Sequence, residues 1–245
     1  MTPHQAPAKV ASTIDKLVNE MTAETGISEP PVDAIRIAKS LGMEIAWDTT
    51  LTGRARMVQL RQHHGPAAAS AIFLRPEPRG ERRQWAVAHE IGESIAHRLF
   101  ADMGTSADDA GEGSREQVAN LFATRLLVPS TWFKEMASSC NWDITELKTP
   151  FSTASHEIIA RRMLDFEPRV VITILDQGKL TFRGGNMGGA APPLQELECA
   201  CQQTVQETGQ PCFLSCEEFS VQGWPIYEGD WRREILRLEA RDSWD

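Results

Sequence analysis

The chain lacks any long apolar segment. No stretch of its 245 residues approaches the roughly 18 apolar residues that a membrane-spanning helix requires. Residues 1–12 are polar and contain no apolar region of the kind that a secretion signal needs. We therefore expect a soluble, cytoplasmic protein with no membrane partner.

Positive charge is also in short supply. The 34 acidic residues outnumber the 25 lysines and arginines, and the formal net charge is -9 at pH 7. A field of this sign repels phosphate backbones, so direct nucleic-acid binding is not expected. One segment is locally basic. It holds four arginines, Arg75, Arg79, Arg82 and Arg83, interleaved with Glu77 and Glu81. They form either a basic patch or, as charge runs usually do, a solvated face.

Cysteine is scarce as well. Five cysteines without a secretion signal indicate reduced thiols and argue against a disulfide framework. Four of them lie close together in the sequence, at Cys199, Cys201, Cys212 and Cys216. Their spacing differs from the paired Cys-x-x-Cys of structural zinc sites. Both a zinc site and a set of small core residues stay open as interpretations.

The length suffices for one large domain or two small ones, and the pattern of elements predicts an α+β fold. We expect a first domain at 1–168, made of helices with a small sheet. A smaller α+β unit should follow at 169–245. The segment 184–193 is rich in Gly and Pro, which makes it a possible linker.

Apolar residues at helical spacing predict five helices, at 10–21, 32–41, 82–100, 115–128 and 155–164. Ser114 and Gln117 fit a capping box before the fourth of these. Short apolar runs predict strands at 43–47, 71–74, 170–175 and 179–183. The last two strands should form a hairpin, and a further turn is expected at 61–65.

The helix predicted at 82–100 carries a pattern suited to metal chemistry. His89 and Glu93 are four residues apart, so both project from one face and can reach one ion. Glu90 lies about 100° round the axis, where the carboxylate of a His-Glu-x-x-His helix acts on the catalytic water. The pattern predicts metal ligands at His89 and Glu93 and a general base at Glu90.

A purely structural helix is the alternative. Small and aromatic residues on the same segment could form a packed stripe, namely Trp85, Ala88, Gly92 and Ala96. However, Gly92 costs a helix roughly 1 kcal/mol relative to Ala. Its presence indicates that another element packs closely at that position.

The helix predicted at 115–128 supplies a third candidate ligand. Glu116 lies along an apolar stripe, on one helical face with Ala119, Asn120, Ala123, Leu126 and Leu127. A carboxylate facing a core is costly unless it is paired or binds a metal, which makes Glu116 the natural third ligand. Alternatively, Glu116 simply complements the helix dipole in the first turn.

Three ordered segments resemble the ImmA/IrrE-type metallopeptidases, a gluzincin-like family. The stretch from Arg82 to Gly92 (RRQWAVAHEIG) is similar to the active-site helix of that family. The stretch from Glu116 to Pro129 is similar to its second helix, and 155–162 to the helix that follows. The resemblance covers roughly 32–176 and is weak beyond Gly184.

The resemblance implies a role for each of these residues. His89 and Glu116 would bind a divalent metal, with zinc as the first choice and manganese or iron as alternatives. Glu90 would be the general base, and the strand near Ile72 would pair with an extended substrate. The protein would be an intracellular endopeptidase acting on a regulatory protein such as a transcriptional repressor. Oligomeric state and substrate identity are not indicated.

One position departs from the family, which usually has His where this sequence has Glu93. A set of one His and two carboxylates favours manganese or iron relative to zinc and acidifies bound water less. The alternative function is therefore a catalytically weak homologue that serves as a protein-binding module. His97 lies about 12 Å of helix rise beyond His89, too far to share its ion. It is either a partner of Glu93 or a plain helix-face residue.

Overall fold

The structure, a computed structural model, describes residues 8–60, 69–102, 104 and 111–241. The turn expected at 61–65 lies outside these residues. The chain forms two compact units, each described by itself. The N-terminal unit comprises the described residues of Ala6–Ser139 together with Lys148–Ser155. The C-terminal unit comprises Cys140–Leu147 and the described residues of His156–Asp245.

Helices make up most of the N-terminal unit. They are α1 (Ala8–Glu24), α2 (Ala34–Ser40), α3 (Gly80–Asp102), α4 (Gly111–Leu127) and α5 (Ser130–Ser139). The four helices predicted in this region are confirmed, whereas α5 was not predicted. The predicted capping box is wrong, because α4 begins at Gly111 and Ser114 already lies inside the helix.

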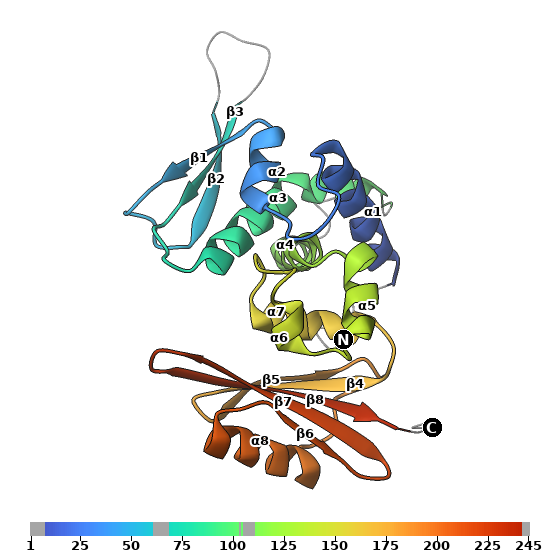
Figure 1. The fold of residues 1–245 in the computed structure, drawn as a ribbon. Helices are drawn as coiled ribbons and strands as arrows, with labels where there is room; N and C mark the ends of the chain where they lie inside the picture. Colours follow the sequence, from blue (N-terminus) through green and yellow to red (C-terminus); the bar gives the residue numbers. More distant parts are fainter. Residues whose placement is uncertain (1–7, 61–68, 103, 105–110, 242–245) are drawn as a thin grey trace. The chain divides into compact units, whose positions relative to one another are not determined.

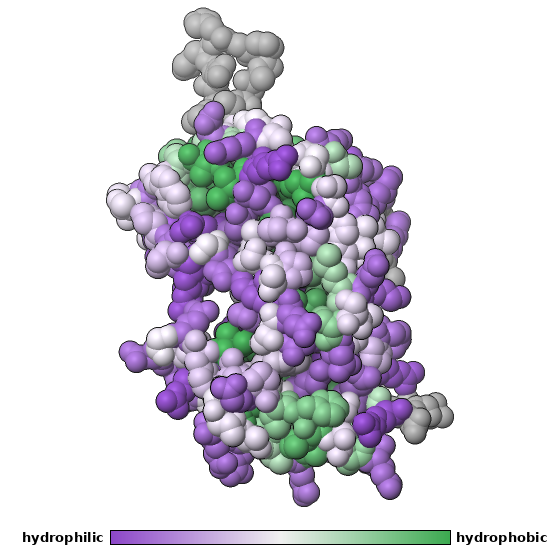
Figure 2. Space-filling view, in the orientation of Figure 1, coloured by the Kyte–Doolittle hydropathy of each residue, from purple (hydrophilic) through white to green (hydrophobic). Residues whose placement is uncertain are grey.

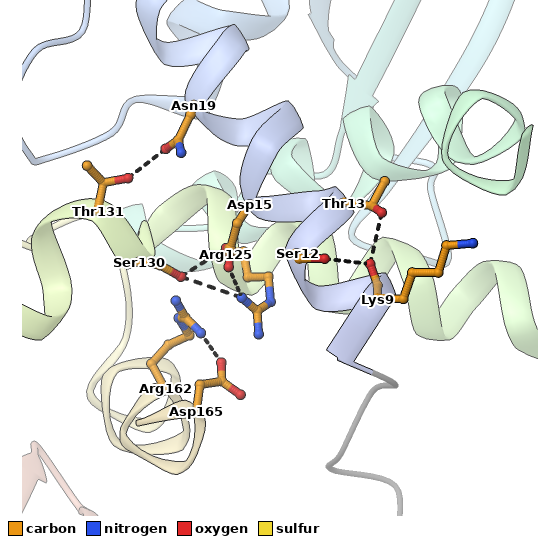
Figure 3. Close-up of polar contacts among 10 residues, drawn as sticks. All are labelled: Lys9, Ser12, Thr13, Asp15, Asn19, Arg125, Ser130, Thr131, Arg162 and Asp165. Carbon is orange, nitrogen blue, oxygen red and sulfur yellow. Dashed lines mark hydrogen bonds and ion pairs between the residues drawn. The ribbon is translucent and has the colours of Figure 1, made fainter. Parts of the chain in front are cut away.

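Polar contacts connect α1 to α4 and to the start of α5 (Figure 3). The buried Arg125 of α4 donates to Asp15 of α1 at 2.6 Å, and the Ser130 hydroxyl donates to the other oxygen of Asp15 at 2.9 Å. At the next turn of α1, Thr131 donates to the side chain of Asn19. Because burial leaves Arg125 little access to water, these hydrogen bonds fix how α1 lies against α4.

A three-stranded sheet lies beside α3 in the N-terminal unit (Figure 1). It consists of β1 (Met43–Trp47), β2 (Ala55–Leu60) and β3 (Ala69–Leu74), in the order β1-β3-β2. β3 pairs parallel with β1 and antiparallel with β2. The expectation that the strand near Ile72 pairs with substrate is wrong, because both edges of β3 are taken by its neighbours. The two edges of this sheet are β1 and β2.

A five-stranded antiparallel sheet forms the centre of the C-terminal unit, in the order β5-β4-β8-β7-β6. Its strands are β4 (Val170–Asp176), β5 (Lys179–Gly185), β6 (Cys212–Ser215), β7 (Phe219–Glu228) and β8 (Trp231–Ala240). β4 and β5 confirm the predicted hairpin. With the helical N-terminal unit, this sheet confirms the predicted α+β class.

Helices lie on both faces of this sheet (Figure 1). α8 (Glu196–Thr208) packs against β6, β7 and β8. α7 (His156–Arg162) and the 3-10 helix η1 (Met163–Asp165) contact β4, and α7 follows α6 (Ile144–Leu147) in this unit. Coverage from both sides explains why β4 is buried along nearly its whole length and reads as a continuous apolar run.

The segment 184–193, expected as a possible linker, lies inside the C-terminal unit. The Asn186 side chain donates to the carbonyl of Phe166 and accepts from the backbone of Val170. Arg183 donates to the carbonyls of Pro192 and Pro193. These hydrogen bonds fold the segment against its own unit. The proposed domain boundary between 168 and 169 stays a prediction.

Of the four clustered cysteines, Cys201 fits the core interpretation, whereas Cys199 and Cys216 are exposed. All five are free thiols, and Cys201 of α8 is fully buried against the sheet. Burial, together with the neighbouring Cys212, raises the pKa of Cys201 to about 12, so this thiol stays protonated. Among the described residues, the cysteines form no cluster with metal-ligand geometry.

Hydrophilic side chains predominate on the face of each unit that Figure 2 shows, and apolar side chains gather there in smaller patches. Within 8–60, 69–102 and 111–241, every helix is too short or too polar to cross a membrane.

Candidate metal centre

Helices α3 and α4 touch at Gly92. A Cβ atom added there would lie 3.0 Å from the Cα of Ala119 and 3.1 Å from its carbonyl oxygen. Any larger residue would therefore press on the backbone of α4. The prediction that another element packs closely at Gly92 is confirmed. His89 and Glu116 each lie about one helical turn from this contact.

The structure brings the three predicted metal ligands together. Ligand atoms of His89, Glu93 and Glu116 all lie within 4.8 Å of one another. His89 Nε2 is 3.4 Å from an oxygen of Glu116, with 19% of the His89 side chain exposed. Two helices thus present one imidazole and two carboxylates at a single point. Their role as ligands stays a prediction.

Asn120 holds two of these side chains in place. Its Oδ1 lies 3.1 Å from His89 Nδ1, and its Nδ2 donates to Glu116 at 3.0 Å. A proton on Nδ1 leaves the lone pair of Nε2 facing the carboxylates, which is the tautomer that a metal ligand needs. The sequence pattern places Asn120 on the face of Glu116 but does not indicate this role. The available signal was an amide on the same helix face, four residues beyond Glu116.

Glu90 lies beside the cluster and contacts the sheet. Its Oε2 accepts a hydrogen bond from the backbone N–H of Met57 in β2, at 2.7 Å. Burial raises the pKa of Glu90, with the charges of Glu93 and Glu116 adding to the effect. The Met57 N–H and His89 oppose this increase. A carboxylate whose pKa is raised is a stronger base, which is the property that a general base requires.

Two expectations about individual side chains need correction. Glu116 does not face a core, since 59% of its side chain is exposed. It lies near the start of α4, before the fully buried Ala119 and Phe122, so its helix face is not yet covered there. His97 is exposed, and among the described residues no hydrogen bond joins it to Glu93. The helix-face interpretation of His97 is therefore favoured.

The comparisons with known proteins bear on this site. Residues 52–164 match the model of the Peptidase_M78 family, described as the IrrE N-terminal-like domain. This match supports the resemblance of the segment to the ImmA/IrrE-type family. The matched segment is a little under half of the chain, and it contains β2, β3, α3 and α4 with all four predicted site residues. The family is metallopeptidase-like, in keeping with a His-Glu-Glu cluster.

A solved structure shares the fold over most of the chain. The protein named "Mycobacterium tuberculosis transcriptional regulator" superposes with a TM-score of 0.63 at 16% sequence identity. The match covers 93% of this chain and 76% of that one. The likeness therefore extends beyond the ImmA/IrrE-type segment into the C-terminal unit. A search of curated proteins gives no significant match.

Proposed function

We propose that the chain is a metal-dependent peptidase. His89, Glu93 and Glu116 would bind the metal, and an extended protein segment would be cleaved there. One observation carries the proposal. Three side chains able to bind a metal meet within 4.8 Å on the helices of the matched family segment, and the partly buried carboxylate of Glu90 lies beside them.

The donor set suits a catalytic divalent metal. Three protein ligands leave a position open for water or substrate, as in catalytic zinc sites. Asn120 orients His89 and Glu116 in the way that hydrogen-bonded partners orient metal ligands elsewhere. We propose zinc, with manganese or iron as alternatives because two of the three ligands are carboxylates. When bound, the metal would polarise the scissile carbonyl and acidify water.

Glu90 would move the protons of the reaction. One oxygen of its carboxylate is held by the Met57 N–H, which fixes the side chain between β2 and the cluster. The carboxylate would take a proton from the attacking water and deliver it to the departing amide nitrogen. The raised pKa of Glu90 favours uptake of the proton from water, and the protonated carboxyl is still acidic enough to donate it to the amide nitrogen. This assignment makes Glu90 a base and not a ligand.

The edge of β2 is suited to holding the substrate. In an antiparallel strand, successive residues direct their N–H and C=O groups alternately to either side. The carbonyl of Arg54 accepts from Arg75 across the sheet, so the backbone groups of Ala55, Met57 and Gln59 point outward. The Met57 N–H is bound by Glu90, which leaves the other outward groups of this edge for a peptide. An extended peptide can pair with such an edge. β2 thus takes the place that we first expected for the strand near Ile72.

We further propose that the substrate is a regulatory protein of the cell interior, such as a transcriptional repressor. The support is the likeness of three ordered segments to ImmA/IrrE-type metallopeptidases, together with the net charge of -9, which argues against direct binding to nucleic acid. Cleavage or sequestration of a separate DNA-binding protein would let an acidic chain affect transcription.

A binding module is the second candidate function, and Glu93 is the observation that favours it. A second carboxylate lowers the effective positive charge on a bound zinc, which weakens the activation of water. Such a protein would still bind a peptide along β2. Turnover, not metal content, separates the two candidates.

The test compares two variants with the purified wild type. We expect close to one transition metal per chain by elemental analysis. Glu90→Gln should keep the metal and lose peptidase activity, whereas His89→Ala should lose both, because Glu90 acts on water and His89 on the ion. Protein that stays metal-free and fails to bind zinc or manganese on titration would refute the site. Loss of metal from Glu90→Gln would refute its role as base.

A further inference from the structure

A positively charged pocket lies at the junction of β2, β3 and α3. Four arginines and one carboxylate are among its lining residues, which are Arg54, Leu74, Arg75, Glu77, Arg82, Arg83 and Ala86. Two of these arginines are already engaged. Arg82 pairs with Glu77 at 3.4 Å, and Arg83 donates to the Glu77 carbonyl at 2.6 Å.

The guanidinium groups of the other two arginines, Arg54 and Arg75, are not engaged in the same way. Arg54 and Arg75 are exposed at the pocket, and within the described residues their side chains form no hydrogen bond or ion pair. Their backbones are fixed, because the Arg75 N–H donates to the Arg54 carbonyl at 2.9 Å. The two side chains thus start from backbone positions that face each other, and both line the pocket with open guanidinium donors. Guanidinium donors suit a carboxylate, which they can bind in a bidentate manner.

The pocket lies about 10 Å from the candidate metal centre, measured along β2 or along α3. Arg54 precedes Met57 by three residues, about 10 Å along a strand. Arg83 precedes Glu90 by seven residues, also about 10 Å along a helix. Arg54 and Arg83 share the pocket, while Met57 and Glu90 share a hydrogen bond. β2 and α3 therefore run alongside each other from the pocket to the site.

We propose that this pocket is a specificity subsite that binds an acidic side chain of the substrate. The inference rests on the proposed function, because it takes the substrate to be an extended peptide along β2. A peptide in that position advances about 3.3 Å per residue. The pocket would then receive an Asp or Glu about three residues from the one that lies opposite Met57.

An acidic peptide fits the pocket better than a nucleic acid does. Glu77 lies among the arginines, and its pKa is lowered by the Arg79 N–H and the Arg82 guanidinium in spite of burial, so it stays charged. The carboxylates of Glu90 and Glu93 follow further along α3, and that of Glu116 lies beside Glu93 on α4. Alternating charge of this kind repels a continuous phosphate backbone but tolerates a peptide with one acidic residue.

The test measures binding, so that it does not depend on turnover. Fluorescein-labelled octapeptides carry one glutamate at successive positions of an alanine–serine background, and a matched set carries glutamine. Binding to zinc-loaded Glu90→Gln protein is followed by anisotropy. We expect one or two adjacent glutamate positions to bind about five- to tenfold more tightly than their glutamine partners, in the range of a charge-assisted hydrogen bond.

Variants in the same background locate the effect. Arg54→Gln and Arg75→Gln should each remove most of the preference for glutamate, whereas Glu77→Gln should increase it. Arg98→Gln is the matched control, since Arg98 is an exposed arginine of α3 that pairs with Glu20 outside the pocket. It should leave the preference unchanged.

Two outcomes would overturn the subsite. One is equal binding of glutamate and glutamine peptides while Glu90 variants still behave as the proposed function requires. The other is displacement of the peptides by a single-stranded oligonucleotide that binds more tightly and loses affinity in Arg54→Gln and Arg75→Gln. A glutamate preference without any cleavage by the wild type would support the subsite and refute the peptidase.

Discussion

At the residue scale, Glu93 decides what chemistry the site can perform. It stands where the ImmA/IrrE-type pattern usually has His, and the structure places it with His89 and Glu116. A neutral imidazole in its place would leave more positive charge on a bound zinc. The pKa of zinc-bound water falls toward about 7 when the ligands are neutral histidines.

Glu93→His is therefore expected to raise zinc affinity by about tenfold or more and to raise peptidase activity. Zinc affinity is measured by competition with a chelator, and cleavage is measured with a candidate repressor. Glu93→Gln is the control that removes the charge without adding an imidazole, and it should bind zinc more weakly than the wild type. Weaker zinc binding in Glu93→His would instead show that Glu93 serves manganese or iron.

Sequence spacing was sufficient to nominate the four site residues but not their supporting contacts. His89, Glu90 and Glu93 lie on one helix, where the helical repeat alone relates their directions. Asn120 and the N–H of Met57 could not be assigned in this way. Their roles depend on how α4 and β2 lie against α3, which is a matter of tertiary packing.

At the element scale, the contact between α3 and α4 sets the geometry of the cluster. Because Gly92 has no Cβ, the two helices approach closely. An added Cβ would lie 3.0 Å from the Cα of Ala119 and 3.1 Å from the ring of Phe122. Because His89 comes from one helix and Glu116 from the other, the separation of the helices also sets the separation of these two side chains.

Gly92→Ala should destabilise the protein by about 1–2 kcal/mol, because the overpacking of α4 outweighs the better helix propensity of alanine. Zinc affinity should fall at the same time as His89 and Glu116 move apart. Chemical denaturation and chelator competition measure the two effects. Gly113→Ala is the control, since a Cβ there meets no atom within 4 Å. It should be neutral or slightly stabilising, and a Gly92→Ala protein that behaves the same way would contradict the packing argument.

The sheet of the N-terminal unit shows where strand patterns stop being informative. The apolar run at 71–74 was correctly identified as a strand, but its pattern could not reveal that β3 is central. Strand order depends on which segments pair, and a buried central strand and a buried edge strand have similar sequences. The substrate-binding edge therefore had to be reassigned to β2.

At the scale of the whole molecule, the C-terminal unit draws in segments that precede its sheet in the sequence. The Gln222 side chain of β7 donates to the carbonyl of Asn141 at 2.9 Å, and the guanidinium of Arg237 in β8 stacks on Trp142 at 5.2 Å. Trp142 is buried. Segments 140–147 and 156–165 thus complete their packing only when the sheet is present.

A fragment ending at 168, the predicted domain boundary, should therefore expose apolar surface around Trp142. We expect it to bind a hydrophobic dye such as ANS and to unfold over a broader range than the full chain, because it lacks the sheet that covers these residues. Dye fluorescence and thermal unfolding of both proteins are compared. A sharp transition without dye binding would show that 1–168 folds by itself and would support the domain boundary drawn from the sequence.

The sequence by itself determined the α+β class, the main helices, the β4–β5 hairpin and the residues of the candidate site. These features follow from local periodicity and from the fixed geometry of one helix, which operate over a few residues. Tertiary structure alone decided that Asn120 braces His89 and Glu116, that β2 is the edge beside Glu90, and that four arginines share a pocket. Each of these depends on contacts between elements far apart in the chain, and side-chain spacing within one element carries no information about them.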